Sequence, residues 1–439
     1  MWCRGARQQD QRRIFTGRLP MRILIAPDHF KGSMRAHEVA EIVRASFVRY
    51  LPHAHCTPLP LADGGDGTMA VVVAALGGSF QTVRVRDPLG RLVQARMALV
   101  DCSRTAVLEM ATASGLLRLS SAQRNPLETS TLGTGDLLRA ALDLGVKRIV
   151  LGIGGSATND GGMGMLCALG VRFLDAGGQE LAPAGKHLAA IRKLDLSGLD
   201  PRLAHTQFEV ICDVDNPLLG PQGATWVYGP QKGATTSMQA LLEEGMRCYA
   251  GHLQRHCPRD VVHSPGAGAA GGLGAACIFL GARLRPGVEA IAELVDLEAR
   301  IAASDLVITG EGCIDEQTLH GKTVAGVLRL ARKHDKPTIV IAGRARIGRE
   351  DWQNLGASAL FTTLSDVLPE ADIVATAAAN LERTAASIAA VLGLCSQAPE
   401  PDSGDLGYIS PAPLPCRREA QSADSPLSRW AARRAWLFH

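Results

Sequence analysis

Short apolar runs rich in Val and Ile alternate along most of this chain with longer Ala- and Leu-rich stretches at helical spacing. The short runs lie at residues 21–26, 148–153, 209–212, 306–309 and 338–342. The helical stretches lie at residues 37–50, 135–144, 163–169, 238–253, 273–280, 324–334 and 373–392. Strands that alternate with helices predict parallel sheets with helices on both faces. We therefore expect an α/β protein.

Residues 82–107 follow a different pattern. Apolar and polar residues alternate on both sides of an Asp-Pro-Leu-Gly turn at residues 87–90, which predicts an antiparallel hairpin. At 439 residues the chain is long enough for two or three domains. The hairpin therefore suggests that the middle of the chain forms a second domain with a mixed sheet.

Charge and cysteine content narrow the class of protein. The net charge of +3 is small for this length and implies neither a nucleic acid nor a membrane surface as partner. No apolar run approaches the roughly 18 residues that a membrane span requires. The eleven cysteines form no C-x-x-C pair, and several lie in apolar stretches. This arrangement favours buried thiols in a reducing cytosol over a disulfide framework.

The two ends differ in composition from the body of the chain. Residues 1–20 hold five arginines against one acid, which fits either an organellar presequence or, as we favour, translation from a start upstream of a true beginning at Met21. Residues 396–439 are rich in Pro, Ser and Arg and read as a disordered tail. A partner-binding peptide or an extended reading frame would have the same composition.

The strongest functional signal lies at residues 309–322, Thr-Gly-Glu-Gly-Cys-Ile-Asp-Glu-Gln-Thr-Leu-His-Gly-Lys. We expect the preceding strand to end at Gly-Glu-Gly in a tight loop, where open α/β sheets place their ligands. Glu311 and Asp315 can hold a metal, and Lys322, at the expected start of the next helix, can hold phosphate. This combination predicts a phosphoryl-transfer site.

Two loops near the beginning carry further charged groups. Asp28 and Lys31 follow the first strand in Ala-Pro-Asp-His-Phe-Lys-Gly-Ser, and helix capping explains Ser33 there but not this acid–base pair. Asp63 and Asp66 lie in Ala-Asp-Gly-Gly-Asp-Gly-Thr, which fits an ordinary turn or an anion site made of backbone amides.

Two loops in the middle of the chain also follow predicted strands. Gly154, Gly155 and Ser156 belong to a Gly- and hydroxyl-rich loop whose backbone N–H groups can bind phosphate, although tight packing would explain it equally well. Asp213 and Asp215 are alternate residues, so both carboxylates can face one Mg²⁺.

Two glycine-bearing segments follow later in the chain. Lys232 lies on the turn Gly-Pro-Gln-Lys-Gly, which could equally be a plain loop. The glycines Gly266, Gly268 and Gly271 match G-x-G-x-x-G, the dinucleotide fingerprint. Its context argues against NAD, because residues 261–263 make a poor strand and no β-α-β unit surrounds them. A phosphate cradle at a helix start remains possible.

Taken in this order, seven motifs resemble the bacterial glycerate kinase type-1 family over residues 21–394, leaving out both ends. The resemblance implies an ATP- and Mg²⁺-dependent kinase that converts D-glycerate mainly to 2-phosphoglycerate, with 3-phosphoglycerate as the alternative. It implies a Rossmann-like parallel-sheet domain (residues 21–62 plus 265–395) interrupted by a second mixed-sheet α/β domain (residues 63–264), with the active site in the cleft. The protein would work in the cytoplasm as a monomer or homodimer.

The resemblance also suggests roles for the candidate residues. Lys31 or Lys232 would bind the substrate carboxylate, and Asp213 or Asp28 would accept the hydroxyl proton. The metal ligands would be Asp213, Asp215 and Glu311. Contacts to the triphosphate would come from the loops and the lysine already described, namely Gly154, Gly155, Ser156, Gly266, Gly268, Gly271 and Lys322.

The chain departs from the family pattern at three positions. Cys313 stands where the family commonly has Arg, Glu316 replaces a small residue, and His29 replaces a common Ser. A cysteine cannot neutralise phosphoryl charge as an arginine can, so turnover or substrate preference is affected more than the fold. The alternatives are a kinase for another small hydroxy acid, such as tartronate or erythronate, and a catalytically silent ATP-binding regulatory protein.

Overall fold

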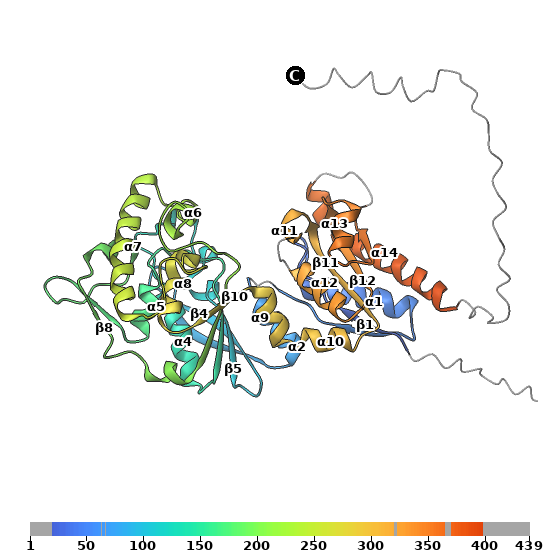
Figure 1. Ribbon diagram of the computed structural model, residues 1–439, viewed down its shortest axis with the longest axis horizontal. Coiled ribbons are helices and arrows are strands. Elements are labelled where there is room, and N and C mark those ends of the chain that lie inside the picture. The colour runs from blue at the N-terminus through green and yellow to red at the C-terminus, as the bar shows by residue number, and fades with distance from the viewer. Residues whose placement is uncertain (1–19, 63, 66, 320–322, 365–369, 398–439) are drawn as a thin grey trace, which may run out of the picture. The chain divides into compact units, whose positions relative to one another are not determined.

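The computed structural model describes residues 20–62, 64–65, 67–319, 323–364 and 370–397 (Figure 1). The ends predicted as extensions, residues 1–20 and 396–439, lie almost entirely outside this part of the chain, and the described residues up to Cys395 form one compact unit. Within it the chain builds two main sheets, each with its own helices. No helix in the described ranges is long and apolar enough to cross a membrane.

The first sheet has five parallel strands in the order β13-β12-β11-β1-β2. Ile23 and Ile25 of β1 face one side and Leu24 the other, as alternation along a strand requires. The strands are β1 (Arg22–Ile25), β2 (His55–Pro58), β11 (Leu306–Ile314), β12 (Thr338–Ala345) and β13 (Ala359–Thr362).

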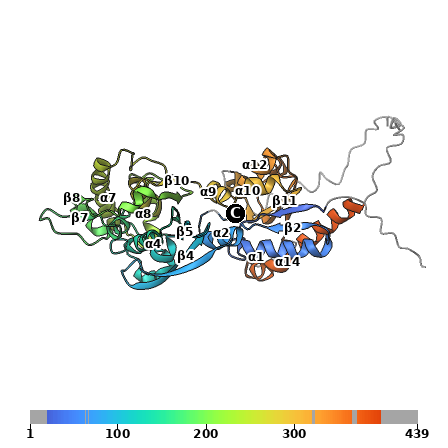
Figure 2. The ribbon, with the colours of Figure 1, turned by 90° about the horizontal axis from the view of Figure 1, so that it is seen from below.

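Helices cover both faces of this sheet. Figure 2 shows α1 (Ala36–Tyr50) and α14 (Glu370–Gln397) side by side, and their apolar residues pack on the face that holds Ile23 and Ile25. Residues of α9 (Gly287–Leu294), α10 (Leu297–Ala302) and α12 (Thr323–Lys333) pack on the face that holds Leu24. The remaining helices here are α11 (Glu316–Leu319) and α13 (Arg349–Asn354).

The second sheet has six strands in the order β10-β9-β6-β5-β4-β3, inserted between β2 and β11. The four strands from β10 to β5 are parallel, whereas β4 pairs antiparallel with both β5 and β3. The strands are β3 (Ser79–Arg86), β4 (Leu92–Val100), β5 (Thr105–Glu109), β6 (Arg148–Gly152), β9 (Gln207–Ile211) and β10 (Arg283–Arg285). A separate pair joins β7 (Arg172–Leu174) to β8 (Lys193–Asp195).

Helices and apolar side chains fill the space around the second sheet. Its α-helices are α2 (Thr68–Leu76), α3 (Ala111–Ser114), α4 (Leu132–Asp143), α5 (Met163–Ala168), α6 (Ala224–Tyr228), α7 (Thr236–His256) and α8 (Ala269–Phe279). Its 3₁₀-helices are η1 (Leu116–Arg118), η2 (Ser121–Gln123), η3 (Gly185–Ala190), η4 (Pro201–His205) and η5 (Pro230–Lys232). Val107 and Val150 of this sheet share an apolar cluster with Leu24 and Val307 of the first.

These features confirm the predicted α/β class, with one parallel sheet interrupted by a mixed one, and the predicted hairpin is β3–β4. Two details differ. The strand expected to end before Gly310 continues as β11 to Ile314, and its pairing with β12 runs from Val307 to Ile314. The chain returns to the first sheet only after β10, later than the predicted boundary at residue 265, because α8 packs in the core of the second sheet and β10 pairs with β9.

Candidate active site

A pocket of about 320 Å³ opens where β6 and β9 end. Parallel neighbours end at the same edge of a sheet, so the segments that follow them meet there, as is usual for ligand sites in α/β folds. The wall combines these two segments with parts of η1, η5 and α8. It consists of Gly64, Leu116, Ile153, Gly154, Gly155, Ser156, Ile211, Cys212, Asp213, Val214, Tyr228, Gln231, Lys232, Ala269 and Ala270.

The loop after β6 presents bare backbone to this pocket. Gly154 and Gly155 are exposed, and Gly155 has a φ of 75°, which favours glycine. The Leu116 N–H donates to the Gly155 carbonyl at 2.9 Å, and Ser156 forms a bridge with Gly115. These contacts fix the loop within the pocket wall, where its exposed backbone suits the binding of an anion by amides.

Lys232 brings a buried cation to the same pocket. Its residue is 1% exposed, and its Nζ donates to the Thr158 carbonyl at 2.7 Å. Burial lowers the pKa of Lys232 from 10.5 to about 7, and the carboxylate of Asp160 opposes that shift. A carboxylate or phosphate entering the pocket would therefore stabilise the charged form of this lysine.

Asp160, which sequence reasoning did not single out, lies fully buried behind the glycine loop. Its carboxylate accepts hydrogen bonds from the Thr131 N–H and hydroxyl, both at 2.8 Å, and from the N–H groups of Gly162 and Gly164, both at 3.1 Å. Burial raises the pKa of Asp160, and these donors act against the rise. The feature of the sequence that could have identified Asp160 is its position in the motif Gly-Gly-Ser-Ala-Thr-Asn-Asp-Gly-Gly.

The two aspartates after β9 are placed differently. Asp213 lies in the pocket wall, and its Oδ1 accepts the Gly287 N–H at 2.7 Å, at the start of α9. Both aspartates are exposed, but Asp215 is not part of that wall. The structure therefore brings the first of this predicted pair to the pocket but not the second.

Asp28 and Glu311 form a second group on the five-stranded sheet, next to each other because the Asp28 N–H donates to the Gly310 carbonyl at 2.8 Å. The Thr323 hydroxyl donates to Asp28 Oδ2 at 2.5 Å, and the Thr318 hydroxyl to Glu311 Oε1 at 2.8 Å. Both carboxylates are less than a tenth exposed. Neither contributes to the wall of the pocket after β6 and β9.

Lys31, in contrast, is exposed, and the loop that carries it lies against β11. A Cβ added at Gly312 would lie 3.0 Å from the backbone nitrogen of Lys31. A larger hollow of about 710 Å³ borders the same loop at His29, Phe30 and Ser33. Lys322 lies outside the described residues, as do Asp63 and Asp66.

The G-x-G-x-x-G glycines lie where α8 begins. A Cβ at Gly268 would overlap the Pro217 carbonyl, and one at Gly271 would overlap the Thr158 carbonyl. Residues 257–268 form bends and turns, so no strand leads into the helix as a dinucleotide fold requires. These two glycines therefore permit close backbone packing, while Ala269 and Ala270 face the pocket.

The donor set near the pocket has the chemistry that Mg²⁺ prefers. Mg²⁺ binds oxygen ligands, keeps several waters, and takes one or two carboxylates together with substrate phosphates. Asp213 beside the glycine loop fits that pattern. Over the described ranges, no group of three or more His, Cys, Asp or Glu side chains is arranged to hold a metal alone. Glu311, predicted as a third ligand, belongs to the other sheet.

Comparison with known proteins identifies the family of this chain. The family described as "Glycerate kinase family" matches residues 23–393. The chain belongs to the glycerate kinase family. It is therefore a kinase, and the resemblance found in the sequence motifs is confirmed over nearly the same residues.

Individual relatives support the assignment over nearly their full length. The chain is 46% identical over 375 residues to the glycerate kinase of Bacillus subtilis, covering 85% of this chain and 98% of that protein. It is 42% identical to the glycerate 2-kinase of Escherichia coli, with the same two shares. A crystal structure described as glycerate kinase 2 from Salmonella typhimurium LT2 matches with a TM-score of 0.79 at 45% identity, covering 86% of this chain and all of the other.

Proposed function

We propose that this chain transfers the γ-phosphoryl group of ATP to D-glycerate, with Mg²⁺, and forms 2-phosphoglycerate. The observation that carries the proposal is one pocket lined by a buried lysine, a carboxylate and exposed glycine amides, namely Lys232, Asp213 and residues 154–155. Its relative in Escherichia coli is named a glycerate 2-kinase, which supports the 2-phosphate as product.

In this proposal the side chains position the substrates and neutralise charge, which is most of what phosphoryl transfer requires. Lys232 would bind the substrate carboxylate, because it is the cation in the pocket wall. The exposed amides of Gly154 and Gly155 would bind phosphate oxygens. Asp213 would hold Mg²⁺, which when bound neutralises phosphate charge.

The transfer balances without any further reactant. The 2-hydroxyl oxygen of glycerate forms a bond to the γ-phosphorus, and the bond from that phosphorus to the bridging oxygen of ADP breaks. The hydroxyl proton passes to a carboxylate, for which Asp213 and Asp28 are the candidates. Asp213 lies in the pocket wall, whereas Asp28 is hydrogen-bonded to Thr323 on the other sheet. Asp213 would accept the proton only where its carboxylate does not hold Mg²⁺ at the same time.

We also propose that the reaction takes place in the cytoplasm. The eight cysteines whose side chains the structure describes are free thiols, which supports a reducing compartment.

A substrate panel tests the choice of glycerate. We expect kcat/KM to be highest for D-glycerate and at least tenfold lower for tartronate and D-erythronate, since a pocket of about 320 Å³ is small and either acid adds polar atoms that need partners. Steady-state kinetics with ATP and Mg²⁺ measure this. A higher kcat/KM for either larger acid would move the proposal to that substrate.

A further inference from the structure

We propose that Arg285 is a positioning residue that holds Asp213 in place through the first turn of α9. Arg285 is the last residue of β10, and α9 begins two residues later. The inference rests on the proposed function, because it takes Asp213 as a group that acts on the substrates.

Two hydrogen bonds, one between backbone groups and one to the Asp213 side chain, join the segment of Asp213 to the turn between β10 and α9. The Cys212 N–H donates to the Arg285 carbonyl at 2.9 Å, and the Gly287 N–H donates to Asp213 Oδ1 at 2.7 Å. Pro286 lies between them, and its ring fixes φ, here −56°. Asp213 therefore accepts an amide at the positive end of a helix, and any shift of this turn moves that amide.

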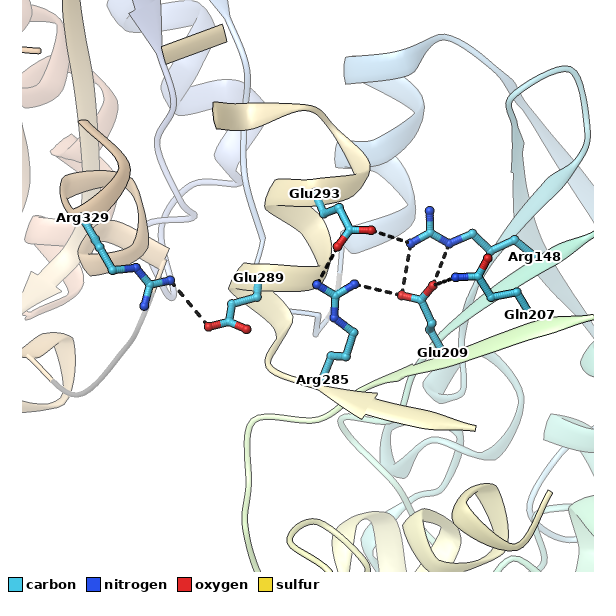
Figure 3. Close-up of polar contacts among 7 residues, drawn as sticks. All are labelled: Arg148, Gln207, Glu209, Arg285, Glu289, Glu293 and Arg329. Carbon is cyan, nitrogen blue, oxygen red and sulfur yellow. Dashed lines mark hydrogen bonds and ion pairs between the residues drawn. The ribbon is translucent and has the colours of Figure 1, made fainter. Parts of the chain in front are cut away.

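The side chain of Arg285 holds this turn from both sides (Figure 3). One guanidinium nitrogen lies 3.2 Å from Glu209 Oε2 on β9, and the other lies 2.7 Å from Glu293 Oε2 on α9. The Arg285 side chain is 12% exposed and that of Glu209 is 4% exposed. A planar guanidinium that pairs with two carboxylates fixes the angle between strand and helix more tightly than a point charge would.

Glu209 is itself held in place by other residues of the sheet. Its carboxylate accepts from Arg148 Nε at 2.9 Å and from the Gln207 side-chain amide at 2.5 Å. Arg148 also lies 3.6 Å from Glu293. The cluster drawn around Arg285 in Figure 3 is thus anchored in β6 and β9, the two strands that lead into the pocket.

Two other residues offer matched controls. Glu289 lies on the same helix as Glu293, but it pairs with Arg329 of α12 at 3.6 Å and not with Arg285. Arg283 lies two residues before Arg285 on β10 and is exposed. If Arg285 acts through Asp213, then Arg283→Met and Glu289→Gln leave turnover near the wild-type value.

A double-mutant cycle tests the inference in the full-length chain. Arg285→Met, Asp213→Asn and the double variant are compared for kcat and for the KM of D-glycerate, with thermal unfolding as the folding control. We expect Arg285→Met to lower kcat by about 10- to 100-fold with a smaller change in KM, because a displacement of about 1 Å costs rate on that scale. Since both changes act on one group, the double variant falls little below Asp213→Asn.

Hydrogen exchange provides a readout that does not depend on activity. The Gly287 amide should exchange faster in both Arg285→Met and Asp213→Asn, because each loosens the same hydrogen bond, while Arg283→Met leaves its exchange unchanged. Arg285→Lys should recover part of both the turnover and the protection. If Arg285→Met does not fold, Glu293→Gln takes its place in the cycle, with a smaller loss expected.

The experiments distinguish failure of the positioning role of Arg285 from failure of the proposed function. Wild-type turnover for Arg285→Met, or an equal loss from Arg285→Met in the wild-type and Asp213→Asn backgrounds, would overturn the positioning role. The same would hold if Glu293→Gln, used in its place, behaved like Glu289→Gln. A folded wild-type chain with no glycerate kinase activity would instead overturn the proposed function, and the exchange of Gly287 would still decide whether Arg285 holds Asp213.

Discussion

Lys232 lies buried in the pocket wall, and among the described contacts its ammonium group donates to one backbone carbonyl, that of Thr158. Its charge depends on pH near neutrality, because burial lowers the pKa of Lys232 to about 7. The substrate carboxylate is ionised at any such pH. The charged form of Lys232 attracts the carboxylate and the neutral form does not, so substrate affinity follows the protonation of this side chain.

We therefore predict that kcat/KM for D-glycerate falls by about tenfold per pH unit above the lysine's pKa in the free enzyme. Lys232→Met should raise the KM for glycerate by roughly 100-fold and remove this pH dependence, since loss of a charge-assisted partner costs about 2–3 kcal/mol. Initial rates between pH 6 and 9 at saturating ATP measure both. A flat profile for the wild-type chain would remove Lys232 from substrate binding.

Sequence alone could identify Lys232 and Asp213, because each follows a recognisable turn or strand. It could not identify Tyr228 and Gln231 as wall residues, since the wall draws on segments as distant as Gly64 and Ala270. Nor could it distinguish Asp213 from Asp215, because which of two alternate residues faces a pocket depends on the backbone after the strand ends.

At the scale of elements, the long strands and helices could be predicted because their apolar periodicity is strong, whereas β11 was predicted too short. The misleading signal was glycine, which usually marks loops. In β11 a Cβ at Gly310 would overlap the Ile341 carbonyl of β12, and the glycine permits close approach within the sheet. Composition cannot separate these two uses of glycine.

Two glycine substitutions test this distinction. Gly310→Ala should destabilise the protein by roughly 1–3 kcal/mol, because its Cβ meets fixed backbone. Gly251→Ala, in the middle of α7 with open space around the added Cβ, should stabilise it by about 0.5–1 kcal/mol. Urea unfolding of both variants measures the change. Similar stability for the two would show that packing in β11 tolerates a side chain.

At the scale of the whole molecule, the two sheets share apolar packing. Val107 and Val150 from the mixed sheet lie in one buried cluster with Leu24 and Val307 from the parallel sheet. A domain with its own core can unfold alone, whereas a shared core couples the two parts. The two-domain division stays a prediction, and the shared cluster leads us to expect that the two parts unfold together.

We therefore predict a single cooperative unfolding transition. Trp226 in α6 and Trp352 in α13 report on the mixed and the parallel sheet respectively, and fluorine NMR of fluorotryptophan follows each as urea is raised. The two midpoints should coincide, and Val107→Ala should lower both equally. This shift corresponds to a loss of roughly 1–3 kcal/mol in the free energy of unfolding. Separate midpoints would mean that the shared cluster does not couple the sheets.

Whether this chain phosphorylates glycerate at its 2-hydroxyl can be measured by ³¹P NMR of the full-length chain with ATP, Mg²⁺ and D-glycerate. The proposed function predicts a growing 2-phosphoglycerate signal together with ADP. A 3-phosphoglycerate signal would keep the kinase but contradict the proposed product. ATP binding without any phosphoester would contradict catalysis itself, favour a silent nucleotide-binding protein, and point first to Cys313, which is paired in register with Arg344 on β12.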